Sequence, residues 1–271
     1  MYDTVYHRPQ TINDAVKLCS ELDEPAYLSG GHTLIPAMKG RLAAPAHLID
    51  VRRIPDLAGI TVTSDHVLIG SATTHAEVAA SAPIASAIPA LPGLAGSIGD
   101  VQVRNVGTMG GSVANNDPAA DYPSAVLALD ATIVTDRREI AADDYFDGLY
   151  STVLEPSELL TRIKYKIPTI AGYAKFRNPA SRYALAAAFI AKYAGGSVRV
   201  AITGAGNSGV FRWKEAEDAI ANGATSDAIK NLHLDPEDMM GDMHASAEYR
   251  SHLVTIVTAR ALDHLGGVNI T

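Results

Sequence analysis

The sequence predicts an α+β protein built from two domains, and two observations indicate this. The chain has 271 residues, more than a single hydrophobic core usually spans, and its 47% hydrophobic and 19% charged residues are typical of a globular protein. Strand-like and helical runs alternate up to about residue 172, whereas three strand-like runs and then helical stretches lie beyond it. We therefore expect one domain over residues 1–172 and a second over residues 173–271.

The first fifty or so residues predict a small β-α-β unit. Thr11 and Asp14 have the spacing of a helix cap before an apolar pattern with helical periodicity. The pattern predicts strands over 26–29 and 47–51 and helices over 12–22 and 33–39. This unit would be a first subdomain, about 1–55, and the rest of the first domain, 56–172, a second one.

The second subdomain is expected to mix strands and helices around one irregular stretch. Thr74 and Glu77 have the spacing of a capping box. The predicted strands cover 61–63, 67–70, 131–135 and 158–167, and the predicted helical turns cover 74–97 and 121–130. Residues 99–117 are rich in glycine and asparagine and predict an irregular stretch.

The second domain is expected to be a sheet followed by helices. Strand-like runs at 183–192, 197–204 and 210–213 are separated by glycine-bearing turns, which predicts a three-stranded antiparallel sheet. Helices are expected over 214–221, 225–232 and 247–265, and the last of them is followed by Gly266 and Gly267, as helices often are.

Composition excludes several classes of function. The formal net charge of −8 and the scattered Lys and Arg residues leave no basic surface for nucleic acid. No window has the unbroken apolar length of a membrane helix, and the polar start lacks a signal-peptide core, so we expect a cytoplasmic protein without an integral membrane segment. Cys19 is the only cysteine, so the chain alone forms no disulfide and holds no iron–sulfur cluster. The nine histidines show no metal-ligand spacing, and no metal is assigned.

The first of two glycine motifs is Ser-Gly-Gly-His-Thr-Leu at 29–34, between a predicted strand and a predicted helix. Glycines allow positive φ and close backbone approach, and a helix N-terminus favours an anion, so a phosphate is the natural ligand. A plain tight turn is the alternative. The motif is neither G-x-G-x-x-G nor a P-loop, which argues against a Rossmann domain.

The second motif runs from Val103 to Asn115 and combines glycines with small hydroxyl and amide side chains. Such a loop offers many hydrogen-bond donors and little bulk, so it can wrap an extended anion. A buried crossing, where close backbone contact excludes side chains, is the alternative. Together the two motifs could hold both phosphates of a dinucleotide, and a bulky residue at Gly110 would then block the approach of the ligand.

Five segments together carry a family resemblance. The two glycine motifs occur with Asn-Asp-Pro-Ala-Ala-Asp-Tyr-Pro at 116–123, Leu-Glu-Pro-Ser-Glu-Leu-Leu at 154–160 and Lys-Phe at 175–176. The set resembles the FAD subunits of bacterial CO dehydrogenase and the flavin domain of xanthine dehydrogenases and aldehyde oxidases, over essentially the whole chain. The resemblance implies the two-part FAD-binding domain of the vanillyl-alcohol oxidase (PCMH) type, followed by the C-terminal domain of CO dehydrogenase flavoproteins.

The resemblance also implies which residues bind FAD. Residues 29–33 and 108–112 would hold the pyrophosphate, and Asp121 would bond the adenosine part. Lys175 would lie near the flavin, and Leu160 near the adenine or the flavin ring. The implied cofactor-binding residues are Ser29, Gly30, Gly31, His32, Thr33, Leu34, Thr108, Met109, Gly110, Gly111, Ser112, Asn115, Asp121, Leu160, Lys175 and Tyr183.

Two of these residues have a second interpretation. Tyr183 corresponds to an aromatic residue that covers the flavin ring in several family members, and a half-buried strand tyrosine is the alternative. The backbone of His32 could serve the ligand while its ring only packs. The flavin would be the redox centre, so no side chain is assigned as catalytic.

The resemblance implies an oxidoreductase subunit that works inside a complex. Its FAD would accept electrons from iron–sulfur clusters in a small partner subunit and pass them to an external acceptor, while a large partner subunit holds the molybdenum cofactor. A dimer of such heterotrimers is expected. The alternatives are a free-standing FAD-dependent oxidoreductase of the same fold and a structural subunit without flavin.

Overall fold

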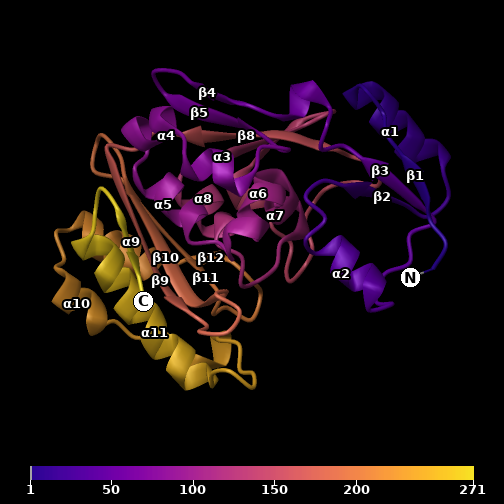
Figure 1. Ribbon diagram of the computed structural model, residues 1–271. Helices are drawn as coiled ribbons and strands as arrows, with labels where there is room; N and C mark the ends of the chain where they lie inside the picture. Colours follow the sequence, from indigo (N-terminus) through magenta and orange to yellow (C-terminus); the bar gives the residue numbers. More distant parts are fainter. Residues whose placement is uncertain (1) are drawn as a thin grey trace.

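The computed structural model describes residues 2–271, and three sheets with helices around them form its framework (Figure 1). The strand orders are β1-β3-β2, β4-β5-β8-β6-β7 and β12-β11-β10-β9-β13. Helices pack on these sheets, which confirms the predicted α+β class.

The first sheet forms the N-terminal unit at the right of Figure 1. Its elements are β1 (Val5–His7), α1 (Ile12–Glu21), β2 (Pro25–Leu28), α2 (Leu34–Lys39) and β3 (His47–Asp50). The three strands are parallel, as a β-α-β unit requires. The predicted cap is present, because the Thr11 hydroxyl accepts the backbone N–H of Asp14 at 3.1 Å. Strand β1 was not predicted, since three residues are too few for a periodic pattern.

The second unit is an antiparallel sheet next to a cluster of short helices. The sheet consists of β4 (Ile60–Val62), β5 (His66–Gly70), β6 (Thr132–Thr135), β7 (Glu139–Ala141) and β8 (Leu160–Lys166). The helices are α3 (His75–Ala79), α4 (Ala82–Ala87), α5 (Ala90–Gly96), α6 (Val101–Val106), α7 (Met109–Asn115) and α8 (Tyr122–Ala128). The capping box predicted at Thr74 and Glu77 begins α3.

The stretch 99–117 is not irregular, and that prediction was wrong. It folds into α6 and α7, each started by a side-chain cap: Asp100 accepts the backbone N–H of Val103 at 2.8 Å, and Thr108 accepts that of Gly111 at 3.2 Å. The glycines lower intrinsic helix propensity, but the caps and the packing of α7 against β8 outweigh that effect.

The C-terminal part contains the predicted sheet with two additional strands. Strands β10 (Ala184–Lys192), β11 (Val198–Thr203) and β12 (Phe211–Arg212) pair in antiparallel order as predicted. Strand β9 (Ile170–Arg177) pairs antiparallel with β10, and β13 (Val268–Ile270) pairs parallel with β9. The boundary predicted near residue 172 falls inside β9. Helices α9 (Lys214–Ala221), α10 (Ser226–Lys230) and α11 (Ala247–Asp263) complete this part.

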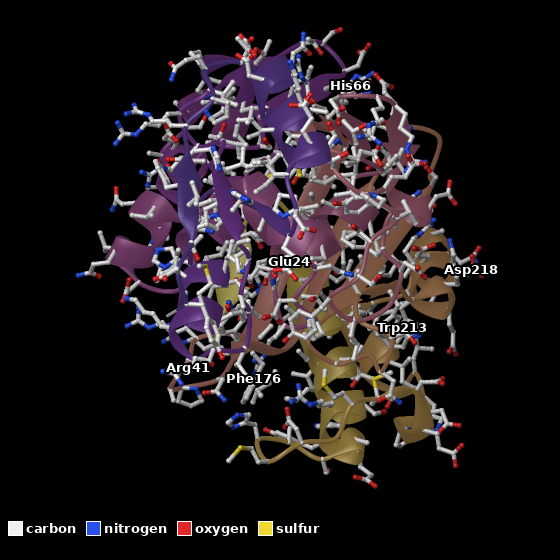
Figure 2. All side chains as sticks on the ribbon, turned by 90° about the vertical axis from the view of Figure 1, so that its right-hand side faces the viewer. Glu24, Arg41, His66, Phe176, Trp213 and Asp218 are labelled. Atoms are coloured by element: carbon white, nitrogen blue, oxygen red, sulfur yellow. The ribbon has the colours of Figure 1, made fainter. Side chains whose placement is uncertain are left out.

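Both faces of the C-terminal sheet are covered. On β10, Ala187 and Phe189 belong to the core shared with α5 and α8, whereas Ala188 and Ile190 belong to the core under α9 and α11. Figure 1 shows the central helices on one side of this sheet and the yellow α11 on the other. In the turned view of Figure 2, Asp218 of α9 points outward, while Trp213 at the start of that helix is buried. Alternate side chains of β10 therefore point to opposite faces of the sheet and belong to two separate cores.

Gly172 allows α11 to approach β9 closely, and this contact can be tested. A Cβ at Gly172 would lie 2.4 Å from the carbonyl oxygen of Ala261, a helix backbone atom that has little room to move. We expect G172A to lower the free energy of unfolding by about 1–3 kcal/mol in urea denaturation. At Gly241 the nearest atom would be 3.6 Å away, so G241A should change stability little. Equal stability of the two variants would contradict the close contact.

Candidate functional site

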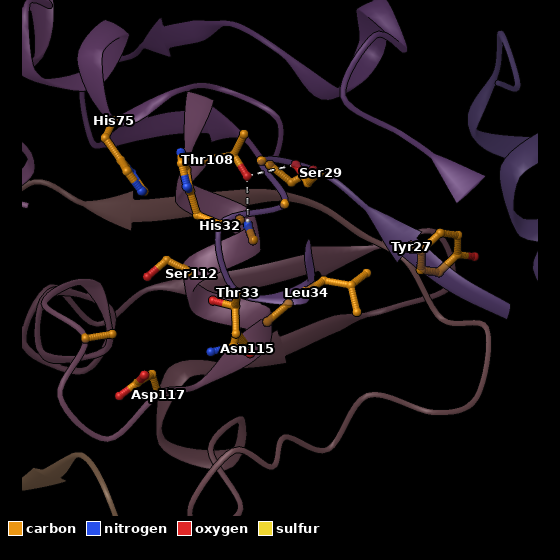
Figure 3. Close-up of a pocket in the computed structure, with 18 of the residues that line it drawn as sticks. Tyr27, Ser29, His32, Thr33, Leu34, His75, Thr108, Ser112, Asn115 and Asp117 are labelled. Atoms are coloured by element: carbon orange, nitrogen blue, oxygen red, sulfur yellow. Dashed lines mark hydrogen bonds between the residues drawn. The ribbon is translucent and has the colours of Figure 1, made fainter. Parts of the chain in front are cut away.

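A pocket of about 520 Å³ lies where the three parts of the chain meet. Its wall combines β2 and the loop after it, the start of α7, the segment 117–121, the segment 154–160 and the turn before β10. Figure 3 labels pocket residues from β2, the loop after it, the α7 region and Asp117. The volume lies within the range of roughly 300–1,000 Å³ that is common for ligand and cofactor sites.

The loop between β2 and α2 supplies unpaired backbone donors to this wall. Gly31 has a φ of +69°, which turns the chain from the strand into the helix. Within residues 2–271, the backbone N–H groups of residues 30–34 donate to no backbone or side-chain acceptor. All five residues line the pocket. A row of unpaired N–H groups beside the start of a helix is suited to a phosphate.

The second glycine motif was expected to offer hydrogen-bond donors to an anion, but two of its backbone N–H groups bond to other parts of the chain. The N–H groups of Met109 and Gly110 donate to the carbonyls of Thr73 and Ser71, both at 2.9 Å, so these groups are not available to an anion. A Cβ at Gly110 would lie 2.4 Å from the Ser71 Cβ. This is the close crossing that was the alternative interpretation. A bulky residue at Gly110 would therefore disturb the packing of α7 and would not block a ligand directly.

The two glycine motifs touch each other directly. The hydroxyls of Ser29 and Thr108 are 2.8 Å apart, and Figure 3 shows this bond. A Cβ at Gly30 would lie 2.6 Å from the carbonyl oxygen of Val106. Residues 79 positions apart thus form one continuous surface. The pocket-lining residues of the second motif include Thr108, Gly110, Gly111, Ser112 and Asn115.

Asp121 reaches the pocket wall, whereas Lys175 lies behind it. The Lys175 Nζ is 2.8 Å from Asp121 Oδ1 and 3.0 Å from Oδ2, and the Tyr173 hydroxyl also donates to Oδ1. The Lys175 side chain is fully buried. Its ammonium group faces Asp121, and Lys175 does not line the pocket, so its place near the flavin stays a prediction.

The pocket brings together fourteen of the sixteen residues that the resemblance implied. Met109 and Lys175 do not line it, because both are buried behind the wall. The other fourteen do: Ser29, Gly30, Gly31, His32, Thr33, Leu34, Thr108, Gly110, Gly111, Ser112, Asn115, Asp121, Leu160 and Tyr183. Leu160 adds to an apolar side of the pocket with Leu154 and Leu159.

Tyr183 lies at the rim of the pocket, in a tight turn between β9 and β10. Its side chain is 47% exposed, and burial of the remainder raises its pKa. The neighbouring Arg182 donates to the carbonyl of Gly99 at 3.0 Å, which joins the turn to the start of α6. An aromatic ring held half-exposed at this rim can pack on a planar ligand.

His75 and Glu158 are among the pocket residues that were missed as site residues. His75 attracted notice only as part of the capping-box sequence, and Glu158 only as part of a longer quoted segment. Arg138 donates two hydrogen bonds to Glu158, and they lower the pKa of that carboxyl to about 2. Burial lowers the pKa of His75 to about 4, so this ring is neutral at pH 7. No spacing rule in the sequence distinguishes either residue from an ordinary helix or loop position.

Two further classes of site are not formed by the described residues. Between residues 2 and 271, no three or more His, Cys, Asp or Glu side chains gather in a way that could hold a metal ion. Over the same range, every helix is too short or too polar to cross a membrane.

The comparisons with known proteins identify the family. The family model for the FAD binding domain in molybdopterin dehydrogenase matches residues 2–170, so the chain belongs to this family of FAD-binding oxidoreductase subunits. The predicted family, fold and cofactor are therefore confirmed.

Several of the similar proteins are named as medium chains or medium subunits. The chain is 36% identical to the carbon monoxide dehydrogenase medium chain of Afipia carboxidovorans, over 95% of both chains. It is 32% identical to the nicotine 6-hydroxylase medium subunit of Paenarthrobacter nicotinovorans, over 96% of both. A chain in the crystal structure of a Cu,Mo-CO dehydrogenase matches with a TM-score of 0.86 at 33% identity, covering 98% of this chain and 99% of that one.

The buried His75 predicts how stability depends on pH. The unfolded chain takes up a proton at this site near pH 6.5, but the folded chain only near pH 4, so stability falls as pH decreases between these values. The slope is about 1.4 kcal/mol per pH unit at most. We expect urea denaturation at pH 6.5 and 5 to show a loss of about 1–2 kcal/mol in the wild type.

His75→Gln should remove most of this loss. The exposed His244 provides a matched control, and His244→Gln should keep the wild-type dependence. A wild-type slope retained in H75Q would show that another group causes the effect.

Proposed function

We propose that this chain holds FAD in the pocket and passes electrons from iron–sulfur clusters of a partner subunit to an external acceptor. The observation that carries the proposal is the row of unpaired N–H groups at residues 30–34, next to the hydroxyl and amide side chains of the second motif. FAD, when bound, can take electrons singly and release them singly or as a pair.

The other walls suit the remaining parts of FAD. The apolar side chains of Leu154, Leu159 and Leu160 can cover a planar ring, and Asp121 can accept a hydrogen bond from a hydroxyl of the adenosine part. The half-exposed Tyr183 would cover the flavin ring at the rim, where an acceptor can approach. The cofactor-binding residues are thus proposed as the fourteen that line the pocket, with Lys175 acting from behind.

A partner is required by the composition of the chain. Cys19 is the only cysteine, and a cluster usually needs four thiolates, so the iron–sulfur clusters have to lie in another polypeptide. The relatives are named medium chain or medium subunit, which supports a small iron–sulfur subunit and a large molybdenum subunit. The complex is proposed to be a dimer of such heterotrimers.

The division into domains 1–172, with subdomains about 1–55 and 56–172, and 173–271 is part of the same proposal.

The test is to purify this subunit from its native source with whatever copurifies, and to record absorbance and mass spectra. FAD together with a molybdenum subunit and an iron–sulfur subunit would support the proposal. FAD on an isolated chain that is catalytically active alone would indicate a free-standing flavoenzyme. Intact partners without any flavin would indicate a structural subunit. Either of the last two results contradicts the proposal.

The placement of the pyrophosphate can be tested with a charge. His32 lines the pocket within the first glycine motif, so H32E would bring a carboxylate close to the proposed phosphates. We expect the dissociation constant of FAD to rise about tenfold, because two unit charges about 4 Å apart repel each other by on the order of 1 kcal/mol in water. Titration of the apoprotein with FAD, followed by flavin fluorescence, measures it. H32Q is the neutral control, and equal affinity of the two variants would refute the placement.

A further inference from the structure

The C-terminal sheet holds one wall of the pocket in place. The segment 117–121 runs along the ends of β10 and β11, and its carbonyl groups accept hydrogen bonds from them. The Pro118 carbonyl accepts the backbone N–H of Gly204 at 2.8 Å and the Thr203 hydroxyl at 3.1 Å. The same hydroxyl lies 2.7 Å from the carbonyl of Ala120. This segment therefore belongs to the pocket and to the sheet at once.

The strongest of these contacts is made by a buried charge. Asp121 is 4% exposed and receives the ammonium group of Lys175 on both carboxylate oxygens and the hydroxyl of Tyr173 on one. Lys175 and Tyr173 are two positions apart on β9, so they point to the same face of the strand. Neither residue lines the pocket, whereas Asp121 does.

A count of hydrogen-bonding positions shows what remains for a ligand. An ionised carboxylate has about four lone-pair positions. Lys175 and Tyr173 occupy three of them on Asp121. The remaining position can accept a hydrogen bond but cannot donate one, and Asp121 is the member of this group that lines the pocket. Hydroxyl groups are the donors that a flavin dinucleotide carries along its ribityl chain and its ribose.

We propose that Lys175 and Tyr173 are positioning residues that hold the Asp121 carboxylate, ionised and immobile, as the acceptor for a hydroxyl group of FAD. This inference rests on the proposed function. Without the ammonium group, the buried carboxylate would lose its counter-charge, and a buried charge without a partner of opposite sign is costly. The C-terminal sheet thereby contributes to FAD affinity without touching the cofactor.

The test compares the single variants K175M and D121N with the double variant in the full chain. The dissociation constant of FAD is measured on each apoprotein by flavin fluorescence. We expect each single change to raise it at least tenfold. Because Lys175 acts only through Asp121, the double variant should bind FAD no more weakly than D121N alone. Two effects that multiply in the double variant would overturn the proposal, since Lys175 would then act on FAD independently.

Two further variants keep the test interpretable if a charge change prevents folding. Y173F keeps both charges and removes one donor to Asp121, so the dissociation constant should rise about threefold while the melting temperature of the apoprotein changes little; unchanged affinity would contradict the proposal. K166M removes a lysine from the exposed pair between Lys166 and Asp130, 3.4 Å apart, and should leave FAD binding unchanged. If K166M weakened FAD binding as much as K175M, the loss of any positive charge would explain the effect, and the proposal would fail.

The outcome also separates this inference from the proposed function. A wild-type chain that binds no FAD would refute the proposed function itself. If the wild-type chain binds FAD and both K175M and Y173F bind it equally tightly, only the role of these two residues is refuted.

Discussion

The contact between Lys175 and Asp121 joins the two halves of the molecule at the pocket. A fully buried ammonium group is costly unless a carboxylate neutralises it. The folded chain therefore has to place Lys175 of β9 next to Asp121 of the segment 117–121. That meeting places the C-terminal sheet against the helices α5 and α8 and brings the turn with Tyr183 to the rim. The shape of the pocket therefore depends on an ion pair of which only one member, Asp121, lines it.

The glycines of the two motifs serve different needs. Gly31 turns the chain at positive φ and leaves the surrounding N–H groups free for a ligand. Gly30 and Gly110 instead allow backbone to pass backbone at distances that no Cβ would tolerate. The first motif thus supplies the donors, and glycines of both motifs allow the close crossings that support them. The two functions look alike in a sequence, because both require the absence of a side chain.

Local patterns in the sequence predicted most elements, and long-range contacts account for the misses. The caps at Thr11 and Thr74 involve neighbours only three residues away, and both were predicted. Helix α7 was missed because packing outweighs the low helix propensity of Gly110 and Gly111. Helix α6 contains no glycine, but its six residues lie between Gly99 and Gly107, and it was missed for that reason. Fourteen of the implied site residues line the pocket, but Lys175 does not, since its orientation depends on Asp121, 54 positions earlier. His75 and Glu158 were missed because only the tertiary fold brings them to the wall.

The walls of the pocket come from residues between positions 26 and 183, and this spread has a consequence for folding. A partly folded chain cannot present the complete wall, because its loop closures cost entropy until the distant segments meet. FAD can therefore recognise only the native state, and by mass action it shifts the folding equilibrium. At a free concentration one hundred times its dissociation constant, a ligand of this kind adds about 2.7 kcal/mol of stability. The supply of cofactor in the cell would then set how much of the chain escapes proteolysis.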